Sequence, residues 1–350
     1  MRSTPRLLAL VLTGALLAAA CGGDDDPADA ASPASASGDS VSGDLFVTGS
    51  STVEPISVAV AEAMESSFPD VAVDVEGPGT GDGFEKFCAG EAEVTDASRP
   101  IKAEEAEACA ESGVEFIELK VAFDGMSVLT SPSNDAVECL TFADLYALVG
   151  PEAEGVSNWS DAQALAAELG SPTELPDLDL EITAPGEESG TYDSFIELAL
   201  LDLAEGRLES GDVTEDQVET TRPDYSSQSD DNAIISGIEG ADGSFGWVGF
   251  AFAEEAGDRV KELEVDGGDG CVAPSTETIA DGSYPLSRPL FIYVNAAAVD
   301  ENPAVAAYVD FYLGEGIAEV EGAGYVSLPD DQLEETRQAW DSRTTGTREG

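Results

Sequence analysis

Hydrophobic positions along this chain of 350 residues follow two alternating patterns from about residue 44 onward. Short apolar, β-branched runs predict buried strands, and longer segments with apolar residues three or four positions apart predict helices. The predicted strands cover 44–48, 71–75, 116–122, 126–130, 180–184, 245–250 and 288–295. The predicted helices cover 53–68, 83–89, 103–112, 142–149, 159–169, 190–204, 234–238 and 303–313. Alternation of strands and helices is typical of an α/β fold with mainly parallel sheets.

The segment before residue 44 has a different pattern. A short basic start precedes an apolar run over residues 7–20, which is too short to span a membrane and typical of a secretory signal peptide. Cys21 follows three alanines and resembles the lipidation site of a bacterial lipoprotein, although Ala18 stands where leucine is usual. Residues 21–43 are mainly Asp, Ala, Ser, Pro and Gly and predict a flexible acidic tether. We therefore expect removal of residues 1–20 and a lipoprotein anchored at the outer face of the cell membrane; a plain secreted protein is the alternative.

Charge narrows the possible functions. The chain has 72 acidic and 14 basic residues, no histidine and a formal net charge of −58. Such a surface repels nucleic acids and anionic lipid headgroups, so a lipid on Cys21 is the expected membrane contact. The absence of histidine excludes a Ser-His-Asp triad and imidazole metal ligands. Because 42% of the residues are hydrophobic, the chain can still bury a core, and its acidity predicts a protein adapted to concentrated salt.

Four cysteines remain after Cys21, namely Cys88, Cys109, Cys139 and Cys271. An even number in an exported protein predicts two disulfides, for which three connectivities are possible. The favoured pairs are Cys88–Cys109 and Cys139–Cys271, because the first closes a short local loop. Metal binding is the weaker interpretation, since no Cys-x-x-Cys spacing is present.

Glycine and hydroxyl residues gather in four turns of the predicted fold. The turns contain Gly49-Ser50-Ser51-Thr52, Gly79-Thr80-Gly81, Ser98-Arg99 and Ser189-Gly190-Thr191. Hydroxyls and backbone N–H groups at helix N-termini bind anions, and a scarce arginine suits bidentate recognition of an oxyanion. Each turn taken alone also has an ordinary explanation as a helix cap, a flexible loop or a surface salt bridge. Their occurrence in both halves of the chain indicates an anion held between two domains.

These motifs resemble a known family when they are taken together and in order. Gly-Ser-Ser-Thr-Val-x-Pro-Ile, Gly-Thr-Gly-x-Gly-Phe, Ala-Ser-Arg-Pro-Ile and Ser-Gly-Thr are similar to the phosphate-binding protein of the bacterial ABC phosphate importer, in its Ser-Arg-Pro-Ile branch. The segments 225–232 and 285–293 share this resemblance, which extends from about residue 44 to 328. It implies a type II periplasmic-binding fold, in which two α/β lobes joined by two crossing strands close on the ligand. The implied division is lobe one over 44–122 and 295–350, lobe two over 123–287, and the second crossing over 288–294.

The resemblance also implies a monomer that captures inorganic phosphate and delivers it to the transporter's permease. The implied phosphate ligands are Ser50, Ser51, Thr52, Thr80 and Gly81 from lobe one and Ser189, Gly190 and Thr191 from lobe two. Many members carry an arginine four residues before the Ser-Gly-Thr serine, where this chain has Pro185. Arg99, beside Ser98, is therefore the candidate cation.

A carboxylate in the site would distinguish phosphate from sulfate. Near neutral pH phosphate keeps a proton that a carboxylate can accept as a hydrogen bond, whereas sulfate has none and would be repelled. Asp124 is the first candidate because it lies beside the expected hinge, and Asp96 and Glu188 are further candidates by position.

Other functions remain open from the residues alone. One is binding of another oxyanion, such as sulfate or molybdate. A second is a secreted phosphatase or serine hydrolase, which the missing histidine and the absence of a replacing motif disfavour. A third is an adhesion protein that uses its acidic surface to hold cations. We expect no enzyme activity, no cofactor and no metal ion.

Overall fold

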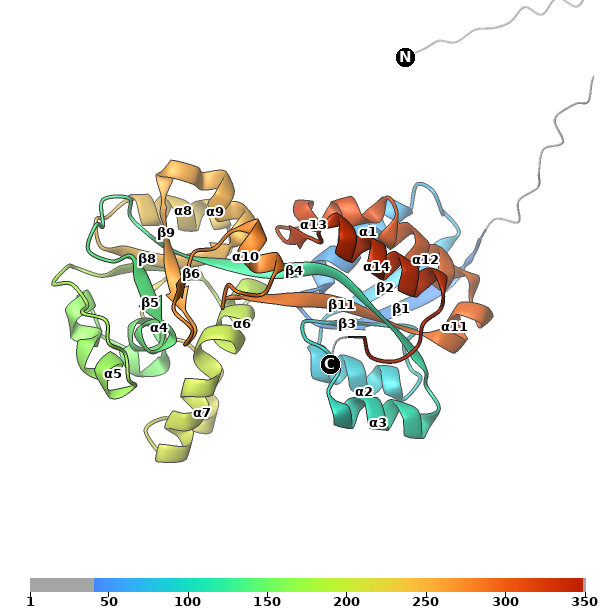
Figure 1. Cartoon of the computed structure of the whole chain (residues 1–350), viewed down its shortest axis with the longest axis horizontal. Helices are drawn as coiled ribbons and strands as arrows, with labels where there is room; N and C mark the ends of the chain where they lie inside the picture. Colours follow the sequence, from blue (N-terminus) through green and yellow to red (C-terminus); the bar gives the residue numbers. More distant parts are fainter. Residues whose placement is uncertain (1–40, 349–350) are drawn as a thin grey trace, which may run out of the picture. The chain divides into compact units, whose positions relative to one another are not determined.

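The computed structural model describes residues 41–348, so the expected signal peptide, Cys21 and nearly all of the tether lie outside the described residues (Figure 1). The strands are β1 (Gly43–Gly49), β2 (Val71–Glu76), β3 (Val94–Ala97), β4 (Phe116–Thr130), β5 (Cys139–Thr141), β6 (Glu181–Pro185), β7 (Ser226–Gln228), β8 (Ser244–Gly249), β9 (Lys261–Asp266), β10 (Cys271–Val272), β11 (Ser287–Asn295) and β12 (Val326–Ser327). The helices are α1 (Glu54–Met64), α2 (Thr80–Cys88), α3 (Ala103–Ser112), α4 (Phe142–Val149), α5 (Gln163–Glu168), α6 (Gly190–Phe195), α7 (Leu201–Ser210), α8 (Asp231–Glu239), α9 (Phe250–Ala256), α10 (Thr276–Ala280), α11 (Ala296–Glu301), α12 (Pro303–Leu313), α13 (Glu319–Gly322) and α14 (Asp330–Asp341).

Two sheets share one strand. The first sheet has the order β2-β1-β3-β11-β4, with helices α1, α12 and α14 on one face and α2 and α3 on the other (Figure 1). The second sheet continues through β4, β8, β6 and β7, and β9 adds a further antiparallel pairing to β4. We call the first sheet with α1–α3 and α11–α14 the first lobe, and the second sheet with α4–α10 the second lobe.

The prediction of mainly parallel sheets was wrong for the strands at the junction. β1 runs parallel to β2 and β3, and β6 runs parallel to β7 and β8. β11, however, is antiparallel to both β3 and β4, and β4 is antiparallel to β8 and β9. The sheets are mixed because the chain returns between the lobes along β11, a direction that apolar runs do not encode.

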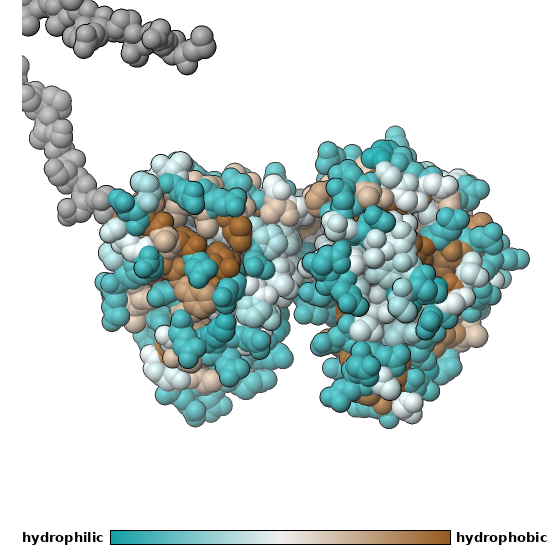
Figure 2. Space-filling model, turned by 180° about the vertical axis from the view of Figure 1, so that it is seen from behind, coloured by the Kyte–Doolittle hydropathy of each residue, from teal (hydrophilic) through white to brown (hydrophobic). Residues whose placement is uncertain are grey.

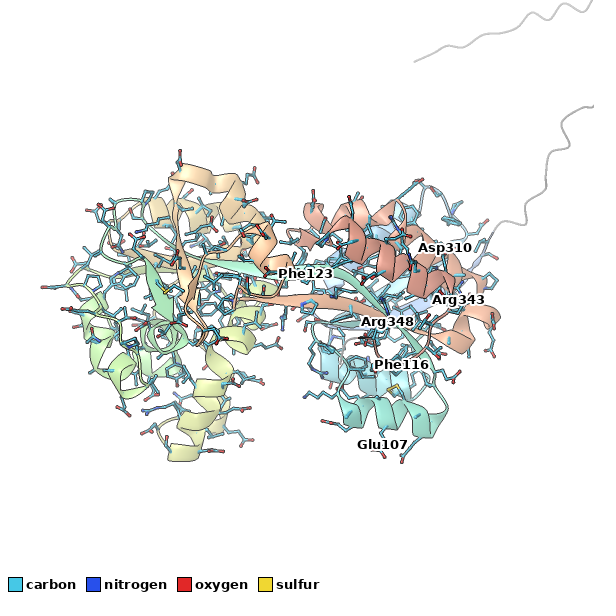
Figure 3. The ribbon with its side chains drawn as sticks, viewed as in Figure 1. Glu107, Phe116, Phe123, Asp310, Arg343 and Arg348 are labelled. Carbon is cyan, nitrogen blue, oxygen red and sulfur yellow. A yellow bond between two sulfur atoms is a disulfide. The ribbon has the colours of Figure 1, made fainter. Side chains whose placement is uncertain are left out.

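β4 is one strand of 15 residues, where the sequence predicted two. Its first part, up to Gly125, pairs with β11, and its second part, from Met126, pairs with β8. A Cβ at position 125 would come within 2.6 Å of the Ile279 Cδ1 atom, so a larger residue there requires that side chain to move. Figure 3 labels Phe116 and Phe123 on this strand, and they pack into the cores of the first and second lobe respectively. β4 therefore belongs to both lobes.

A predicted helix over 190–204 is instead three consecutive segments. α6 is followed by a π-helical stretch, Ile196–Leu200, and then by α7. The wider turn changes the register between α6 and α7, so apolar side chains on both sides of it pack in the same core of the second lobe. A π turn of this kind is often found at functional sites. The predicted helix over 159–169 is likewise divided, into a 3₁₀ turn at Trp159–Ala162 and α5.

Each lobe has its own core and its own disulfide. The second lobe packs around Trp159 and Trp247, and the ring of Trp247 stacks on Phe195 with the centroids 4.2 Å apart. The disulfide Cys88–Cys109 joins α2 to α3, and Cys139–Cys271 joins β5 to β10. These are the two pairs that the sequence favoured, so the predicted connectivity is confirmed.

The C-terminal segment returns to β4. Trp340 of α14 donates a hydrogen bond from Nε1 to Asp310 (2.6 Å), and the Arg343 guanidinium lies 3.5 Å from the Trp340 ring centroid (Figure 3). The N–H of Gly346 then donates to the Phe116 carbonyl (2.9 Å). These contacts anchor the chain end on the first lobe. Within residues 41–348, no helix combines the length and apolar character that crossing a membrane requires.

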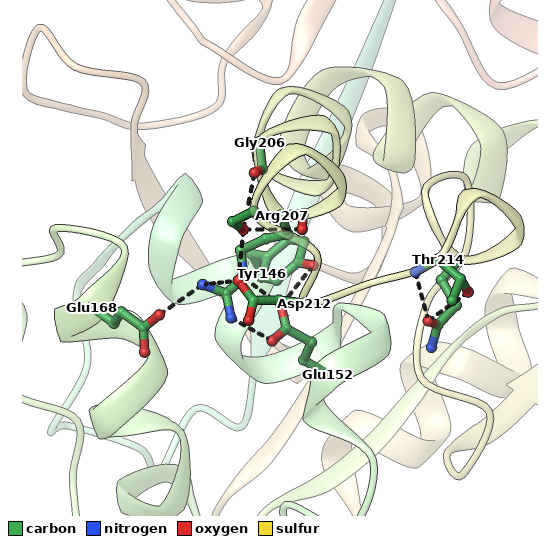
Figure 4. Close-up of polar contacts among 9 residues, drawn as sticks. Tyr146, Glu152, Glu168, Gly206, Arg207, Asp212 and Thr214 are labelled. Atoms are coloured by element: carbon green, nitrogen blue, oxygen red, sulfur yellow. Dashed lines mark hydrogen bonds and ion pairs between the residues drawn. The ribbon is translucent and has the colours of Figure 1, made fainter.

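An ion network in the second lobe accounts for one scarce arginine (Figure 4). Arg207 of α7 pairs with Glu152 and Glu168, each at 2.7 Å, and with Asp212 at 3.3 Å. The Tyr146 hydroxyl donates to Glu152 (3.1 Å), and burial raises the pKa of Tyr146 well above its ordinary value. The network ties α7 to α4. Scarcity of arginine in this chain is therefore no sufficient sign of ligand binding.

Candidate functional site

The turn after β1 is held tightly at its first residue. Gly49 has φ +138°, and a Cβ there would meet the Asp96 carbonyl oxygen at 2.1 Å, so β1 and β3 approach this closely only with glycine. The Ser50 N–H donates to that carbonyl (2.9 Å), and the Ser50 hydroxyl accepts from the Thr52 N–H (3.2 Å). The Ser50 hydroxyl is thus used inside the turn, whereas α1 itself begins after Val53 without a side-chain cap. The hydroxyls of Ser51 and Thr52 remain for other partners.

A second turn of the first lobe lies beside it. Thr80 is the first residue of α2, and its hydroxyl bonds the Ser98 hydroxyl (3.1 Å) and accepts from the Ser98 N–H (3.2 Å). α2 packs closely on the end of β1, since a Cβ at Gly83 would lie 2.4 Å from the Gly49 Cα. The three motifs of the first lobe therefore converge in space, as the sequence indicated.

Arg99 lines a cavity beside these turns, but its guanidinium already has a partner. Its guanidinium makes two hydrogen bonds to Glu105, at 2.7 and 2.8 Å, and lies 5.7 Å from the Phe84 ring centroid. Burial works to raise the pKa of Glu105, but hydrogen bonds from Arg99 and from the Lys102 N–H outweigh it and lower that pKa. The carboxylate orients Arg99 and also neutralises part of its charge.

The motif of the second lobe reaches the first turn. The Ser189 hydroxyl accepts from the Thr191 N–H (3.2 Å) and caps α6. A Cβ at Gly190 would lie 3.5 Å from the Ser51 carbonyl oxygen and 3.7 Å from the Thr52 Cα, so the two backbones are in contact distance. The start of α6 and the turn before α1 thus face each other across the lobes.

Arg288 of β11 occupies the centre of this arrangement, and sequence reasoning gave it no role. Its Nη2 donates to Thr52 Oγ1 (3.1 Å) in the first lobe and to Ser194 Oγ (2.6 Å) in the second. Its Nε pairs with Asp124 (3.3 Å), the residue opposite it on β4, and its Nη1 pairs with Glu197. The side chain is 10% exposed. The available signal was its position in segment 285–293, which resembles the phosphate-binding family.

Two further contacts join the lobes. Ser51 Oγ donates to Asp193 Oδ2 (3.4 Å), and the hydroxyls of Thr52 and Ser194 lie 3.3 Å apart. Desolvation raises the pKa of Asp193, and the neighbouring charge of Glu197 raises it further. Asp193 is therefore a carboxyl group that tends to accept a proton, placed against a hydroxyl of the first turn.

A cavity of about 940 Å³ lies among these groups. Its lining includes the predicted residues Ser51, Thr80, Gly81, Ser98 and Arg99, and also Asp193, Glu197 and Arg288, which were not predicted. The predicted residues outside the lining are Ser50, Thr52, Asp124, Ser189, Gly190 and Thr191. Figure 2 shows the two lobes from behind, separated below their junction, with mainly hydrophilic and intermediate residues facing the gap. Hydroxyl donors and two guanidinium groups around one cavity suit an oxyanion.

The carboxylates considered for the phosphate proton have different surroundings. Asp124 is 5% exposed and pairs with Arg288. Asp96 is fully buried and bonds Ser57 of α1 on the core side of the first sheet. Its carboxyl group therefore does not face the cavity. Asp193 lines the cavity, as do Asp82, Glu197 and Glu219, and it also contacts the first turn.

Known proteins are similar in sequence to this chain over most of its length. A family model described as PBP superfamily domain matches residues 34–315. Protein SphX of Synechocystis sp. is 35% identical over 87% of this chain and 84% of its own length. The phosphate-binding protein PstS of Staphylococcus epidermidis is 32% identical over 91% of this chain and 87% of its own.

Solved structures agree with these matches. The crystal structure of a possible phosphate binding protein from Planctomyces limnophilus has a TM-score of 0.76 and 35% identity, covering 87% of this chain and all of its own. PstS from Borrelia burgdorferi, with 21% identity and a TM-score of 0.58, shares the fold. The two-lobe architecture expected from the sequence is confirmed. The chain belongs to the periplasmic-binding-protein superfamily, has its type II fold, and is a member of the PstS-type phosphate-binding family.

Proposed function

We propose that this protein captures inorganic phosphate outside the cytoplasm and delivers it to the permease of an ABC transporter. The observation that carries the proposal is the position of Arg288, which contacts Thr52 of one lobe and Ser194 of the other beside a polar cavity. The names of the relative from Staphylococcus epidermidis and of the structure from Planctomyces limnophilus refer to phosphate binding, which supports the choice of anion. The homologues are solute-binding proteins, in agreement with a function that is not enzymatic.

The proposed ligands come from both lobes. Ser51, Thr80 and Arg99 would bind from the first lobe, together with their neighbours Ser50, Thr52, Gly81 and Ser98. Ser189, Gly190 and Thr191 would close from the second lobe, and Asp124 would act through Arg288. Short-range donors carry the binding because the negative field of the whole chain opposes approach of a dianion. A closed and desolvated cavity strengthens these donors.

The lobes would move about the two crossing strands. We propose a hinge at β4 and β11, with lobe one over 44–122 and 295–350 and lobe two over 123–287. Besides these strands, the lobes are linked by the Ser51–Asp193 and Thr52–Ser194 contacts and by β12, whose Val326 packs in the core of the second lobe. Hydroxyl contacts of this kind are weak enough to open and close with the ligand.

Export and anchoring follow from the first residues of the chain. We propose that residues 1–20 are removed and that Cys21 carries a lipid, which leaves 21–43 as the tether between membrane and binding protein. A mature N-terminal peptide with unmodified Cys21 would contradict the anchor. PstS-type relatives act outside the cytoplasm, in agreement with this location.

Calorimetric titration with competing oxyanions tests the proposed ligand. We expect phosphate to bind with one site per chain and sulfate to bind at least about 100-fold more weakly, because the carboxyl groups at the cavity repel an anion without a proton. Molybdate serves as a second tetrahedral competitor. Stronger binding of sulfate or molybdate would replace phosphate with another oxyanion, and hydrolysis of a phosphomonoester would indicate an enzyme.

The acidic surface is a separate proposal that concerns the solvent. With a formal charge of −58, self-repulsion lowers stability in dilute buffer, and salt screens it. We expect the melting temperature to rise between dilute buffer and molar sodium chloride. The same melting temperature at both salt concentrations would remove the basis for adaptation to salt.

A further inference from the structure

A buried carboxyl group lies directly behind the turn at residues 49–52, which joins β1 to α1 and which we call the phosphate turn. Asp96 is in β3, with Thr95 and Ala97 on either side, and its side chain is completely buried. It points to the face of the first sheet that α1 and α12 cover, as does Val94 two positions earlier. The proposed ligand-binding residues are on neighbouring segments, but no step of binding described above uses this carboxyl group.

Its two oxygens have unequal surroundings. Oδ1 accepts a hydrogen bond from Ser57 Oγ of α1 (3.0 Å). Within residues 41–348, Oδ2 has no hydrogen-bond partner, and the same is true of the buried Tyr312 hydroxyl. An ionised carboxylate would place negative charge on an oxygen that no donor reaches, whereas a protonated carboxyl group keeps that oxygen neutral.

Among the described residues, no lysine or arginine is bonded to the Asp96 carboxyl group. The titratable side chains that face it are Glu54 of α1 and Tyr308 and Tyr312 of α12. β1 and β11 pair with it through Gly49 and Ile292, which carry no charge. Burial raises the pKa of Asp96 to about 8; the Ser57 hydrogen bond opposes this shift, and the charge of Glu54 adds to it. A buried carboxylate without a cation is costly, so the neutral acid is the stable form near pH 7.

Asp96 also holds both ends of the phosphate turn. Its carbonyl oxygen accepts from the Ser50 N–H (2.9 Å) at the start of the turn. Its side chain bonds Ser57, one turn into the helix that follows. The residues between these two points include Ser51 and Thr52. A change in the charge of this one side chain therefore acts on the backbone and the electric potential of the binding turn together.

We propose that Asp96 is a positioning residue for phosphate binding that works as a neutral acid, and that its ionisation at alkaline pH weakens binding. This inference rests on the proposed function. A carboxylate at this place would put a negative charge behind a turn that receives a dianion. It would also strengthen the hydrogen bond from Ser57 and put charge on Oδ2 where no donor reaches it, which favours a displaced turn.

Stability gives a readout that is independent of ligand. Between about pH 4 and about pH 8, the native protein keeps a proton on Asp96 that the unfolded chain releases. The contribution of this group to the free energy of unfolding therefore falls as pH rises through that window. The unfolding equilibrium constant rises about tenfold for each pH unit. Above about pH 8 the contribution becomes constant, because both states are ionised.

The test compares the wild type with Asp96→Asn, which keeps an oxygen for Ser57 and cannot ionise. Phosphate dissociation constants are measured by calorimetry from pH 6.5 to pH 9.5 for both proteins. The ratio of the wild-type constant to the variant constant cancels the titration of phosphate and of the groups that the two proteins share. We expect this ratio to be constant below about pH 7 and to rise at least about fivefold by pH 9.5. A constant ratio over the whole range overturns the proposal.

Ser57→Ala is the matched control. It removes the hydrogen bond that opposes the raised pKa, so the rise in dissociation constant should move to higher pH. Urea unfolding from pH 5 to pH 9 provides the second measurement, in which the difference in stability between wild type and Asp96→Asn should change with pH in the direction given above. If Asp96→Asn fails to fold, ¹³C NMR of aspartate carboxyl groups in the wild type decides: titration near pH 4 overturns the neutral acid.

The two proposals fail separately. A wild type that binds sulfate or molybdate but no phosphate refutes the proposed ligand, and the ratio is then measured with the anion that binds. A wild type that binds no oxyanion refutes both the function and the positioning role. A wild type that binds phosphate with a pH-independent ratio refutes the role of Asp96 alone.

Discussion

Replacement of Arg288 by alanine should weaken phosphate binding by at least about 100-fold, which corresponds to about 2.8 kcal/mol. The guanidinium makes hydrogen bonds to Thr52 and Ser194 and pairs with Asp124 and Glu197. Each hydrogen bond from a charged group contributes about 1.5–3 kcal/mol, and the loss leaves two carboxylates uncompensated beside the expected dianion. Isothermal titration with phosphate at pH 7.5 measures the change.

Two arginine variants give this experiment its controls. Arg259 pairs with Glu239 away from the cavity, so Arg259→Ala should bind phosphate as the wild type does. Arg99→Ala should lose at least about 1.5 kcal/mol of binding free energy but less than Arg288→Ala, because Glu105 already holds that guanidinium. Wild-type affinity in a folded Arg288→Ala protein would show that the cation of the site lies elsewhere.

Loss of the disulfide Cys139–Cys271 should lower the free energy of unfolding more than loss of Cys88–Cys109. The first bridge joins residues 132 positions apart and the second joins residues 21 apart. In the chain-entropy model these separations correspond to about 5 and about 3 kcal/mol. Urea unfolding of the two double alanine variants measures both values.

Burial modifies this comparison in a known direction. Cys88 and Cys109 are buried, so their alanine variants also lose core contacts, whereas Cys271 is exposed. Unfolding of each double variant before and after reduction isolates its remaining disulfide without a further change of side chains. A larger loss for the Cys88–Cys109 pair, after that control, would contradict the entropic argument.

Helices that were predicted with their bounds have local end signals, as two of them show: α3 ends at Gly113 in the left-handed conformation, and α12 begins after Asn302 with Pro303. The segment 103–112 forms α3 with the same bounds, and 303–313 does so for α12. Short strands such as β5, β10 and β12 have only two or three residues and exist because β9 or β4 pairs with them. Their stability comes from tertiary contacts, so the local sequence contains no signal for them.

The continuity of β4 was missed for a related reason. Phe123-Asp124-Gly125 has the composition of a turn, yet β11 pairs with all three residues. Asp124 is accommodated there because Arg288 stands opposite it on the neighbouring strand. The partner that makes the strand possible is 164 positions away, and a reading of local pattern does not include it.

The residues of the site also differ in whether local sequence or tertiary contacts determine their place. Ser51, Thr80 and Ser98 could be predicted because turns with hydroxyls at helix starts are local features. Arg288 required the register between β4 and β11, and Asp193 required the approach of the two lobes. The interaction of Arg99 with Glu105 is local, six residues apart, and could have been found from the capping pattern at the start of α3.

The place of Arg288 on a crossing strand has a mechanical consequence. A group close to a rotation axis has a short lever arm, so it is displaced little when the bodies on either side turn. With the proposed rotation about β4 and β11, the guanidinium would keep nearly the same position in open and closed states, held by Asp124 beside it. The serines and threonines would move with their lobes, while the positive charge of Arg288 would stay in place. Each lobe would therefore bring its hydroxyl groups to the same guanidinium on closing.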